Sequence, residues 1–241
     1  MHRFYVPPDC IARGEVSIQG ESARQIGRVL RMQPGDTVCV FDGSGDEYIL
    51  RLTSLQRDEA RGAIIERRHG TTEPAAQVTM YLALLNKPDK LEWAIQKCTE
   101  VGAAAFVPLL TSRTVAGPPA PSRYERWSRI IQEAAEQSGR TTLPALDPAL
   151  SFAQAAASSL AIIPTLDAKF SLARALQPVA GRPDANMSIF IGPEGGFTPG
   201  EIADAAAAGV VPVTLGPRTL RAETAAPVAL ALALHALGEM G

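Results

Sequence analysis

Two glycine-containing loops carry the residues whose types and spacing could do chemistry. Residues 192–196 read GPEGG and residues 216–221 read GPRTLR, and each loop directly follows an apolar run. Glycine permits backbone angles that other residues resist, so such loops can bring main-chain groups close to a ligand. One Gly-Pro turn alone would indicate only the end of a strand. Two in succession favour a binding site, and their charged residues are Glu194, Arg218, Arg221 and Glu223.

Neither loop has the spacing of a phosphate-binding motif. No Gly-Lys-Ser/Thr follows the glycines, as a Walker A loop requires, and the G-x-G-x-x-G fingerprint is absent. A nicotinamide-dependent dehydrogenase is therefore a distant alternative. His2, His69 and His235 are the only histidines, and all lie outside both loops. This distribution argues against a histidine-centred base or nucleophilic triad.

Two strand-loop-helix units must position these loops. Residues 187–191 form an apolar run typical of a strand, and residues 198–201 (TPGE) form a capping box that starts a helix. The pattern repeats with a strand at 210–215 and a helix at 223–237. Two strand-loop-helix units in tandem predict that their two strands are parallel neighbours in one sheet. Because ligands of open α/β sheets bind beyond the carboxyl ends of the strands, both loops would face the ligand.

The remainder of residues 78–241 alternates strand and helix in the same way. Apolar runs predict further strands at 78–85, 105–110 and 160–164, and amphipathic patterns predict helices at 87–102, 123–138 and 172–176. This alternation predicts an α/β domain built on a parallel sheet with helices on both faces.

Residues 1–70 indicate a different architecture. Short alternating segments, with a hairpin turn at 42–45 (DGSG), predict a small β-barrel. The polar segment at 71–77 contains a proline and no periodicity, so it is expected to link the two domains.

One helix is expected within this barrel, at residues 22–31. A Ser-x-x-Gln box would open it, and one side would bury Ile26, Val29 and Leu30. The opposite side would then carry three arginines at helical spacing, Arg24, Arg28 and Arg31.

Composition leaves RNA binding open. The net charge of −2 argues weakly against it, but residues 1–70 hold ten arginines and no lysine. Guanidinium groups suit both phosphates and stacked bases, although a solvated surface paired with acids is an equal alternative. Three scattered cysteines favour neither disulfides nor zinc, and no signal peptide or membrane span is recognisable. A cytoplasmic protein without metal or membrane is therefore expected.

Several segments together resemble one known family. They read FIGPEGGFTPGEI, LGPRTLRAET, KPDKLEWAIQKCTEVGA, EAAEQSGR and, near the amino end, ARQIGRVLRMQPGD. These are similar to the motifs of the ribosomal RNA small subunit methyltransferase E family, which belongs to the SPOUT superfamily. One departure is Gln25, because relatives often carry histidine there.

The resemblance implies a fold, a reaction and partners. The fold would be a SPOUT-type parallel sheet with a carboxyl-terminal trefoil knot, preceded by a PUA-like barrel. The reaction would be methylation of N3 of a 16S rRNA uridine, within the small ribosomal subunit, by a homodimer that uses S-adenosylmethionine. The cofactor would be held by Leu166, Gly192, Pro193, Glu194, Gly195, Leu215, Gly216 and Leu220.

The chemistry of this implied reaction suggests roles for charged residues. Uridine N3 must lose a proton, and a guanidinium could stabilise the oxyanion that develops on the base. Arg140 and Arg221 are the candidates for that guanidinium, and Glu194 and Glu223 are the weaker candidates for the proton acceptor. An ion pair that orients a loop is the alternative for each arginine. RNA contact is expected from Arg3, Arg24, Arg28, Arg31 and Arg113.

Two other functions stay open on the sequence. Another SPOUT activity, such as ribose 2′-O methylation, would use the same cofactor loops. A non-catalytic RNA-binding assembly factor would keep the fold without the reaction.

Overall fold

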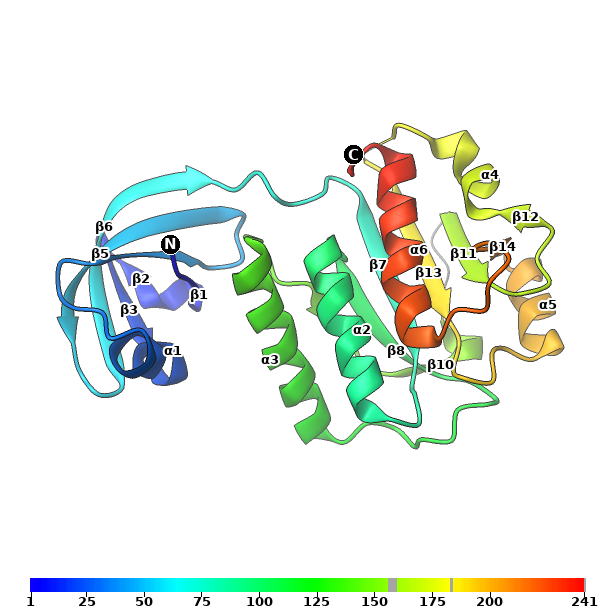
Figure 1. Ribbon diagram of the computed structural model, residues 1–241, viewed down its shortest axis with the longest axis horizontal. Helices are drawn as coiled ribbons and strands as arrows, with labels where there is room; N and C mark the ends of the chain where they lie inside the picture. Colours follow the sequence, from blue (N-terminus) through cyan, green and yellow to red (C-terminus); the bar gives the residue numbers. More distant parts are fainter. Residues whose placement is uncertain (156–159, 183, 241) are drawn as a thin grey trace. The chain divides into compact units, whose positions relative to one another are not determined.

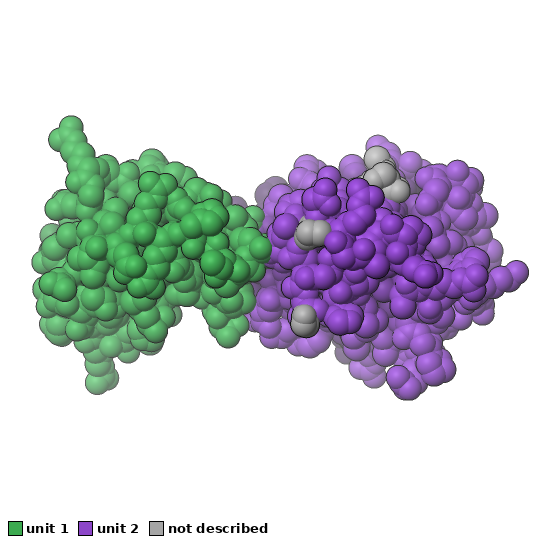
Figure 2. Space-filling view, turned by 90° about the horizontal axis from the view of Figure 1, so that it is seen from above, with its two compact units in different colours: residues 1–73, 135–143 green, residues 74–134, 144–241 purple. Residues whose placement is uncertain are grey.

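The chain forms two compact units, coloured separately in Figure 2. The computed structural model describes residues 1–155, 160–182 and 184–240. The first unit contains residues 1–73 and 135–143, and the second contains residues 74–134 and 144–241. The segment 135–143 thus belongs with the amino-terminal residues although it lies far from them in sequence.

The first unit is built on a mixed six-stranded sheet. In spatial order its strands are β1 (Arg3–Tyr5), β4 (Thr37–Phe41), β5 (Asp46–Leu55), β6 (Glu59–His69), β3 (Glu15–Gln19) and β2 (Ile11–Ala12). β1 pairs parallel with β4, and the other pairs are antiparallel. Two register shifts between β5 and β6 mark bulges, which bend and twist a sheet. Alternate side chains such as Val38, Val40 and Leu50 fill the core of the unit.

The helix of this unit differs from the expected one. It begins as α1 (Gly20–Arg24), with Gln19 rather than Ser22 at the N-cap position and no side-chain capping hydrogen bond, so the expected Ser-x-x-Gln box is wrong. The chain then winds into a π-helix over Gln25–Val29. A π turn closes i→i+5 hydrogen bonds and so rotates later residues off the expected face. Val29 is consequently 72% exposed instead of buried, whereas Ile26 is fully buried as expected.

The second unit contains a parallel eight-stranded sheet. The path runs β10 (Leu150–Ser151), β8 (Ala105–Leu110), β7 (Gln77–Ala83), β13 (Asn186–Ile191), β11 (Leu160–Pro164), β14 (Val211–Thr214) and β12 (Phe170–Ser171), with β9 (Ala145–Leu146) beside β8. Every pair is parallel. β13 and β14 are parallel as predicted, but they are not neighbours, because β11 lies between them.

Helices cover both faces of this sheet. They are α2 (Pro88–Val101), α3 (Pro121–Ser138), α4 (Leu172–Leu176), α5 (Pro199–Ala207) and α6 (Ala222–Leu237). α6 packs against α2, α4, β7 and β13, and it lies in front of β7 and β13 in Figure 1. On the other face, Ala205 of α5 shares a core cluster with Phe190 and Ile163, to which no described residue of α6 contributes.

The termini of these helices agree with local physical chemistry. Thr198 caps α5 in a reciprocal box with Glu201, as predicted, and Pro199 occupies the first turn. Gly102 ends α2 at a φ of 118°, a left-handed angle that favours glycine. Among the described residues, none of the helices has both the length and the apolar character needed to cross a bilayer.

Candidate functional site

A cavity of ≈ 760 Å³ lies at the carboxyl ends of β11, β13 and β14. Its volume falls within the range of small-molecule sites. The loops after these three strands line it, together with Lys87, Lys90 and Arg113. All eight residues predicted to hold a cofactor contribute to its wall: Leu166, Gly192, Pro193, Glu194, Gly195, Leu215, Gly216 and Leu220. Their role in cofactor binding stays a prediction, but the structure brings them together.

A second hollow of ≈ 640 Å³ lies beside the first turns of α2 and α3. Neither predicted glycine loop lines it, and its most prominent polar feature is a paired Arg126–Glu92 contact with N···O distances of 2.6 and 2.7 Å. The glycine-loop cavity is therefore the stronger candidate for chemistry.

Two glycines in the cavity wall disfavour substitution by any other residue, for different reasons. Gly216 has a φ of 111°, which strains any L side chain. Thr214 fixes this turn, because its hydroxyl accepts from the Gly216 N–H at 3.2 Å and donates to the Gly216 carbonyl at 3.1 Å. At Gly192 the obstacle is space, since a Cβ there would lie 3.0 Å from the Phe197 ring.

Glu201 fastens the first glycine loop to the segment after β8. Its Oε1 accepts from the Ser112 N–H at 2.8 Å, and its Oε2 accepts from the Thr198 N–H at 2.8 Å. Desolvation acts to raise the pKa of this buried carboxyl, but the hydrogen bonds from Ser112 and Thr198 outweigh it and lower the pKa below the ordinary value. The capping residue of α5 therefore also sets the spacing between two loops.

Replacing Glu201 with Gln should loosen these loops in a pH-dependent way. One acceptor oxygen becomes a donor amide, so a buried N–H loses its partner at a cost of ~1–3 kcal/mol. Because the folded pKa of Glu201 is lowered, its contribution is complete above the unfolded value of 4.5 and is lost as the pH falls through the folded value. Denaturant titrations of both proteins from neutral to acid pH would measure the difference, which should shrink below about pH 4.5. Asp204→Asn, an exposed change on the same helix, should show no such trend.

Arg113 supports the same loop from its other side. Its Nη1 donates to the carbonyl oxygens of Gly195 and Phe197, and the side chain lines the cavity. The sequence assigned Arg113 to RNA contact, and that role stays a prediction. The observed contacts show that this guanidinium shapes the glycine loop.

Three of the four residues predicted to be catalytic line this cavity. Glu194 accepts from the Asn86 N–H at 3.1 Å through Oε1. Glu223, in the first turn of α6, pairs with Lys90 at 3.0 Å. Arg221 occupies the N-cap position of α6, is exposed, and forms no ion pair with another described residue.

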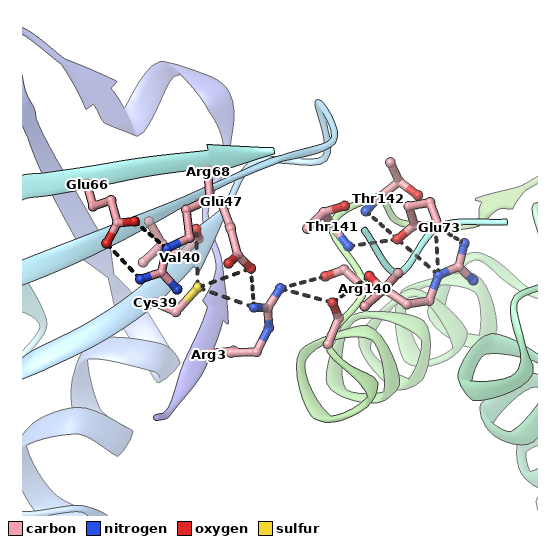
Figure 3. Close-up of polar contacts among 12 residues, drawn as sticks. Arg3, Cys39, Val40, Glu47, Glu66, Arg68, Glu73, Arg140, Thr141 and Thr142 are labelled. Carbon is pink, nitrogen blue, oxygen red and sulfur yellow. Dashed lines mark hydrogen bonds and ion pairs between the residues drawn. The ribbon is translucent and has the colours of Figure 1, made fainter. Parts of the chain in front are cut away.

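Arg140 is the fourth, and it does not line this cavity. Its guanidinium donates to Oε2 of Glu73 from Nη2 at 2.7 Å and from Nε at 3.1 Å (Figure 3). Oε1 of Glu73 accepts from the backbone N–H groups of Thr141 and Thr142 at 2.7 and 3.1 Å. Desolvation raises the pKa of Glu73, but these contacts outweigh it and leave the pKa lowered. The ion pair orients the 139–142 turn, and a catalytic role for Arg140 stays a prediction.

The predicted RNA-binding arginines of the first unit differ in their partners. Arg3 is half-buried, pairs with Glu47, and donates to the carbonyl oxygens of Gly139 and Arg140 at 3.2 and 3.1 Å (Figure 3). Three others are exposed: Arg24 pairs with Asp58, whereas Arg28 and Arg31 form no ion pair within the described residues. Of the predicted RNA-binding arginines in this unit, those at the end of the π-helix are thus the ones whose guanidinium groups form no ion pair with a described residue.

Sequence reasoning missed Lys87 and Lys90 as part of the cavity. Both follow the carboxyl end of β7, and Lys90 lies in the first turn of α2. The rule that placed the glycine loops, that ligands lie beyond the carboxyl ends of parallel strands, could also have found these lysines. No group of three or more His, Cys, Asp or Glu residues that could hold a metal occurs in the described part of the chain.

Family models define the class to which this fold and cavity belong. A model of an RNA methyltransferase domain matches residues 72–234, and a model of an RNA methyltransferase PUA domain matches residues 18–65. The first match covers the parallel sheet with its cavity, and the second covers part of the separate mixed sheet, so the class is that of an RNA methyltransferase with a PUA domain.

Individual relatives narrow this class further. The chain is 38% identical to ribosomal RNA small subunit methyltransferase E of a Synechocystis species, over 95% of this chain and 76% of the relative. It is 35% identical to the Bacillus subtilis protein of the same name, over 89% of this chain and 87% of that one. The chain therefore belongs to the ribosomal RNA small subunit methyltransferase E family, and the resemblance seen in the sequence is confirmed.

Solved structures agree with this membership. The Neisseria gonorrhoeae member, bound to S-adenosyl methionine, superimposes with a TM-score of 0.86 at 30% identity, covering 98% of this chain and 97% of that one. A Legionella pneumophila methyltransferase, in complex with the same cofactor, gives a TM-score of 0.86 at 26% identity and covers 97% of each chain.

Proposed function

We propose that this protein transfers a methyl group from S-adenosylmethionine to N3 of a uridine in 16S rRNA. One observation carries the proposal: the cavity brings together all eight cofactor residues expected from the family resemblance. Relatives named for small-subunit rRNA methylation and a related structure with bound S-adenosyl methionine support the reaction class.

The residues present fit such a cofactor. A nucleoside without phosphates needs backbone groups for the adenine edges and apolar surfaces for the ring, rather than a lysine-bearing cradle. The cavity offers glycine backbone at Gly195 and Gly216 and apolar side chains at Leu166, Leu215 and Leu220. When bound, the cofactor supplies a methyl group already activated on a sulfonium. Holding the two reactants in line can contribute ~7–11 kcal/mol. A general base typically contributes a factor of ~10²–10⁴ in rate, so positioning is the larger part of the catalysis.

In this proposal the charged residues of the cavity act on the target base, by stabilising its negative charge and by accepting its proton. Arg221 stabilises negative charge on O2 or O4 of the uracil as N3 loses its proton. Glu194 or Glu223 accepts that proton, because each has a carboxylate in the cavity wall. Arg140 stays a further candidate for the guanidinium.

We extend the proposal to the organisation of the chain. Residues 1–70 would form the PUA-like RNA-binding domain, residues 71–77 the linker, and residues 78–241 the SPOUT catalytic domain with its trefoil knot. RNA contact would come from Arg3, Arg24, Arg28, Arg31 and Arg113, of which Arg28 and Arg31 are the most available. An rRNA substrate, within the small subunit, implies action in the cytoplasm.

The proposal also includes an oligomeric state, in which the protein is a homodimer. α6 and the cavity loops would form the interface, as the family resemblance implies. Two exposed apolar side chains support the proposed interface. Leu232 of α6 is 43% exposed, and Trp93 of α2, the helix that packs against α6, is 44% exposed.

The test is to incubate the protein with labelled cofactor and small ribosomal subunits, or free 16S rRNA, and to identify the labelled atom. Label on N3 of a single uridine is the expected result. Label on a ribose 2′ oxygen would show that the protein has another SPOUT activity, ribose 2′-O methylation, instead of the proposed one. Absence of both label and cofactor binding would instead indicate an RNA-binding assembly factor.

A further inference from the structure

Lys90 and Glu223 join the first turns of two helices at the wall of the cavity. Nζ of Lys90 lies 3.0 Å from Oε1 of Glu223, and both residues line the cavity. Their side chains are only 24% and 14% exposed, so the pair is shielded from most of the solvent. Shielded pairs hold their geometry better than ion pairs on an open surface.

The second oxygen of Glu223 is left without a partner. Oε2 is buried and forms no hydrogen bond to any described residue. A buried acceptor that lacks a donor costs free energy, so proteins seldom retain one without a reason. Glu223 lines a cavity of small-molecule size, so a rotation of its side chain on substrate binding would turn this oxygen toward the cavity, where a donor group on a ligand would satisfy it.

The surroundings keep this carboxyl ionised. Desolvation acts to raise the pKa of Glu223, but hydrogen bonds from its own backbone N–H and from Lys90, with the charges of Lys90 and Arg221, lower it below the ordinary value. The other charged residues of the cavity wall are Lys87, Arg113, Asp167, Glu194 and Arg218. Lys90 is therefore the principal side-chain partner that opposes the effect of burial.

We infer that Lys90 is a positioning residue: it holds Oε1 of Glu223, and Oε2, turned toward the cavity when the substrate binds, accepts the N3 proton of the target uracil. This inference rests on the proposed function and selects Glu223, rather than Glu194, as the acceptor. The proton passes from N3 to Oε2. The electron pair left on N3 forms the bond to the methyl carbon, and the pair of the broken carbon–sulfur bond stays on the donor sulfur.

Glu194 is less suited to this role. Its Oε1 already accepts from the Asn86 N–H at 3.1 Å, and the residue is exposed at the tip of the first glycine loop. The carboxylate of Glu223, in contrast, is shielded from solvent and has one oxygen without a partner. Water therefore competes more easily with a substrate for hydrogen bonds to Glu194 than to Glu223.

The pH dependence of turnover tests the inference. In Lys90→Met the effect of burial on the pKa of Glu223 is opposed only by its own backbone N–H and the charge of Arg221, so the acid limb of the kcat profile should move to higher pH. Because the carboxylate also loses the contact that fixes its orientation, kcat at neutral pH should fall by about tenfold, a part of the ~10²–10⁴ that a general base supplies. Lys90→Arg should restore most of the activity, because a guanidinium can hold the same oxygen. Lys97→Met, which breaks the Lys97–Glu100 pair on the same helix, is the matched control and should leave the profile unchanged.

A double-mutant cycle separates this role from direct RNA binding. Glu223→Gln cannot take up the proton, so adding Lys90→Met to it should lower kcat no further. The inference is overturned if Lys90→Met keeps the wild-type profile, if its effect persists in the Glu223→Gln background, or if it raises only KM and flattens the salt dependence of RNA binding. Calorimetric cofactor affinity of all variants should match the wild type, and kcat is compared well below the melting temperature of each variant, because Lys90→Met leaves the shielded Glu223 carboxylate without its partner. A wild-type protein that neither binds cofactor nor methylates RNA would refute the proposed function instead.

Discussion

Gly192→Val should abolish cofactor binding while the second unit stays folded. A Cβ at residue 192 would lie 3.0 Å from Cδ2 and Cε2 of the Phe197 ring and 3.4 Å from the Gly196 backbone. Phe197 cannot easily yield, because it is 7% exposed and packs 5.0 Å from the Phe152 ring. The loop must therefore move into the cavity. Overpacking of this kind costs ~1–3 kcal/mol, and we expect calorimetric affinity to fall by about 100-fold or more.

Gly216→Val tests the second loop by a different mechanism. No atom lies within 4 Å of the position that a Cβ would take, so the penalty comes only from the backbone, at a φ of 111°. Loss of binding in both variants would show that each loop contacts the ligand. Gly200→Ala is the matched control, since its Cβ would meet only the Thr198 hydroxyl at 3.9 Å and the helix favours alanine. Wild-type affinity in both valine variants would refute the cofactor site.

Local elements of the second unit could be predicted because their signals are local. Residues 198–201 contain every atom of the capping box of α5. The limits of β8 and β11 agree with the apolar runs that predicted them, and those of α4 agree with its amphipathic pattern. The order of strands is a different kind of property. β11 separates β13 from β14 although it precedes both in sequence, and hydrophobic periodicity carries no information on which strand becomes the neighbour of which.

Side-chain partners were the least predictable feature, because they come from distant segments. Arg113 appeared available for RNA until the structure placed it on the carbonyl oxygens of Gly195 and Phe197. Glu73 lies in the segment expected to be a linker, yet it binds Arg140 and the turn beside it. In both cases the sequence shows the charged residue, but only the fold shows which groups it binds.

Arg221→Ala should lower turnover by ~10²–10³ with little change in cofactor affinity, if its guanidinium stabilises the oxyanion of the target base. The side chain is exposed in the cavity wall and forms no ion pair with any described residue, so its removal leaves no carboxylate unpaired. A fall in kcat at constant KM for both substrates would indicate an interaction made only in the transition state. Arg221→Lys, which keeps the charge but loses the planar fork, should recover part of the rate.

Arg140→Ala provides the contrast that makes this result interpretable. Arg140 is 4% exposed, and Glu73 would be left as a largely buried, unpaired carboxylate, which typically costs ~3–5 kcal/mol of stability. We therefore expect Arg140→Ala to lower the unfolding free energy, and Arg221→Ala to leave it unchanged. Arg140→Ala with Glu73→Gln should regain stability, so any loss of turnover that remains in the double variant would belong to the guanidinium itself. Normal turnover in both single variants would exclude a catalytic role for either arginine.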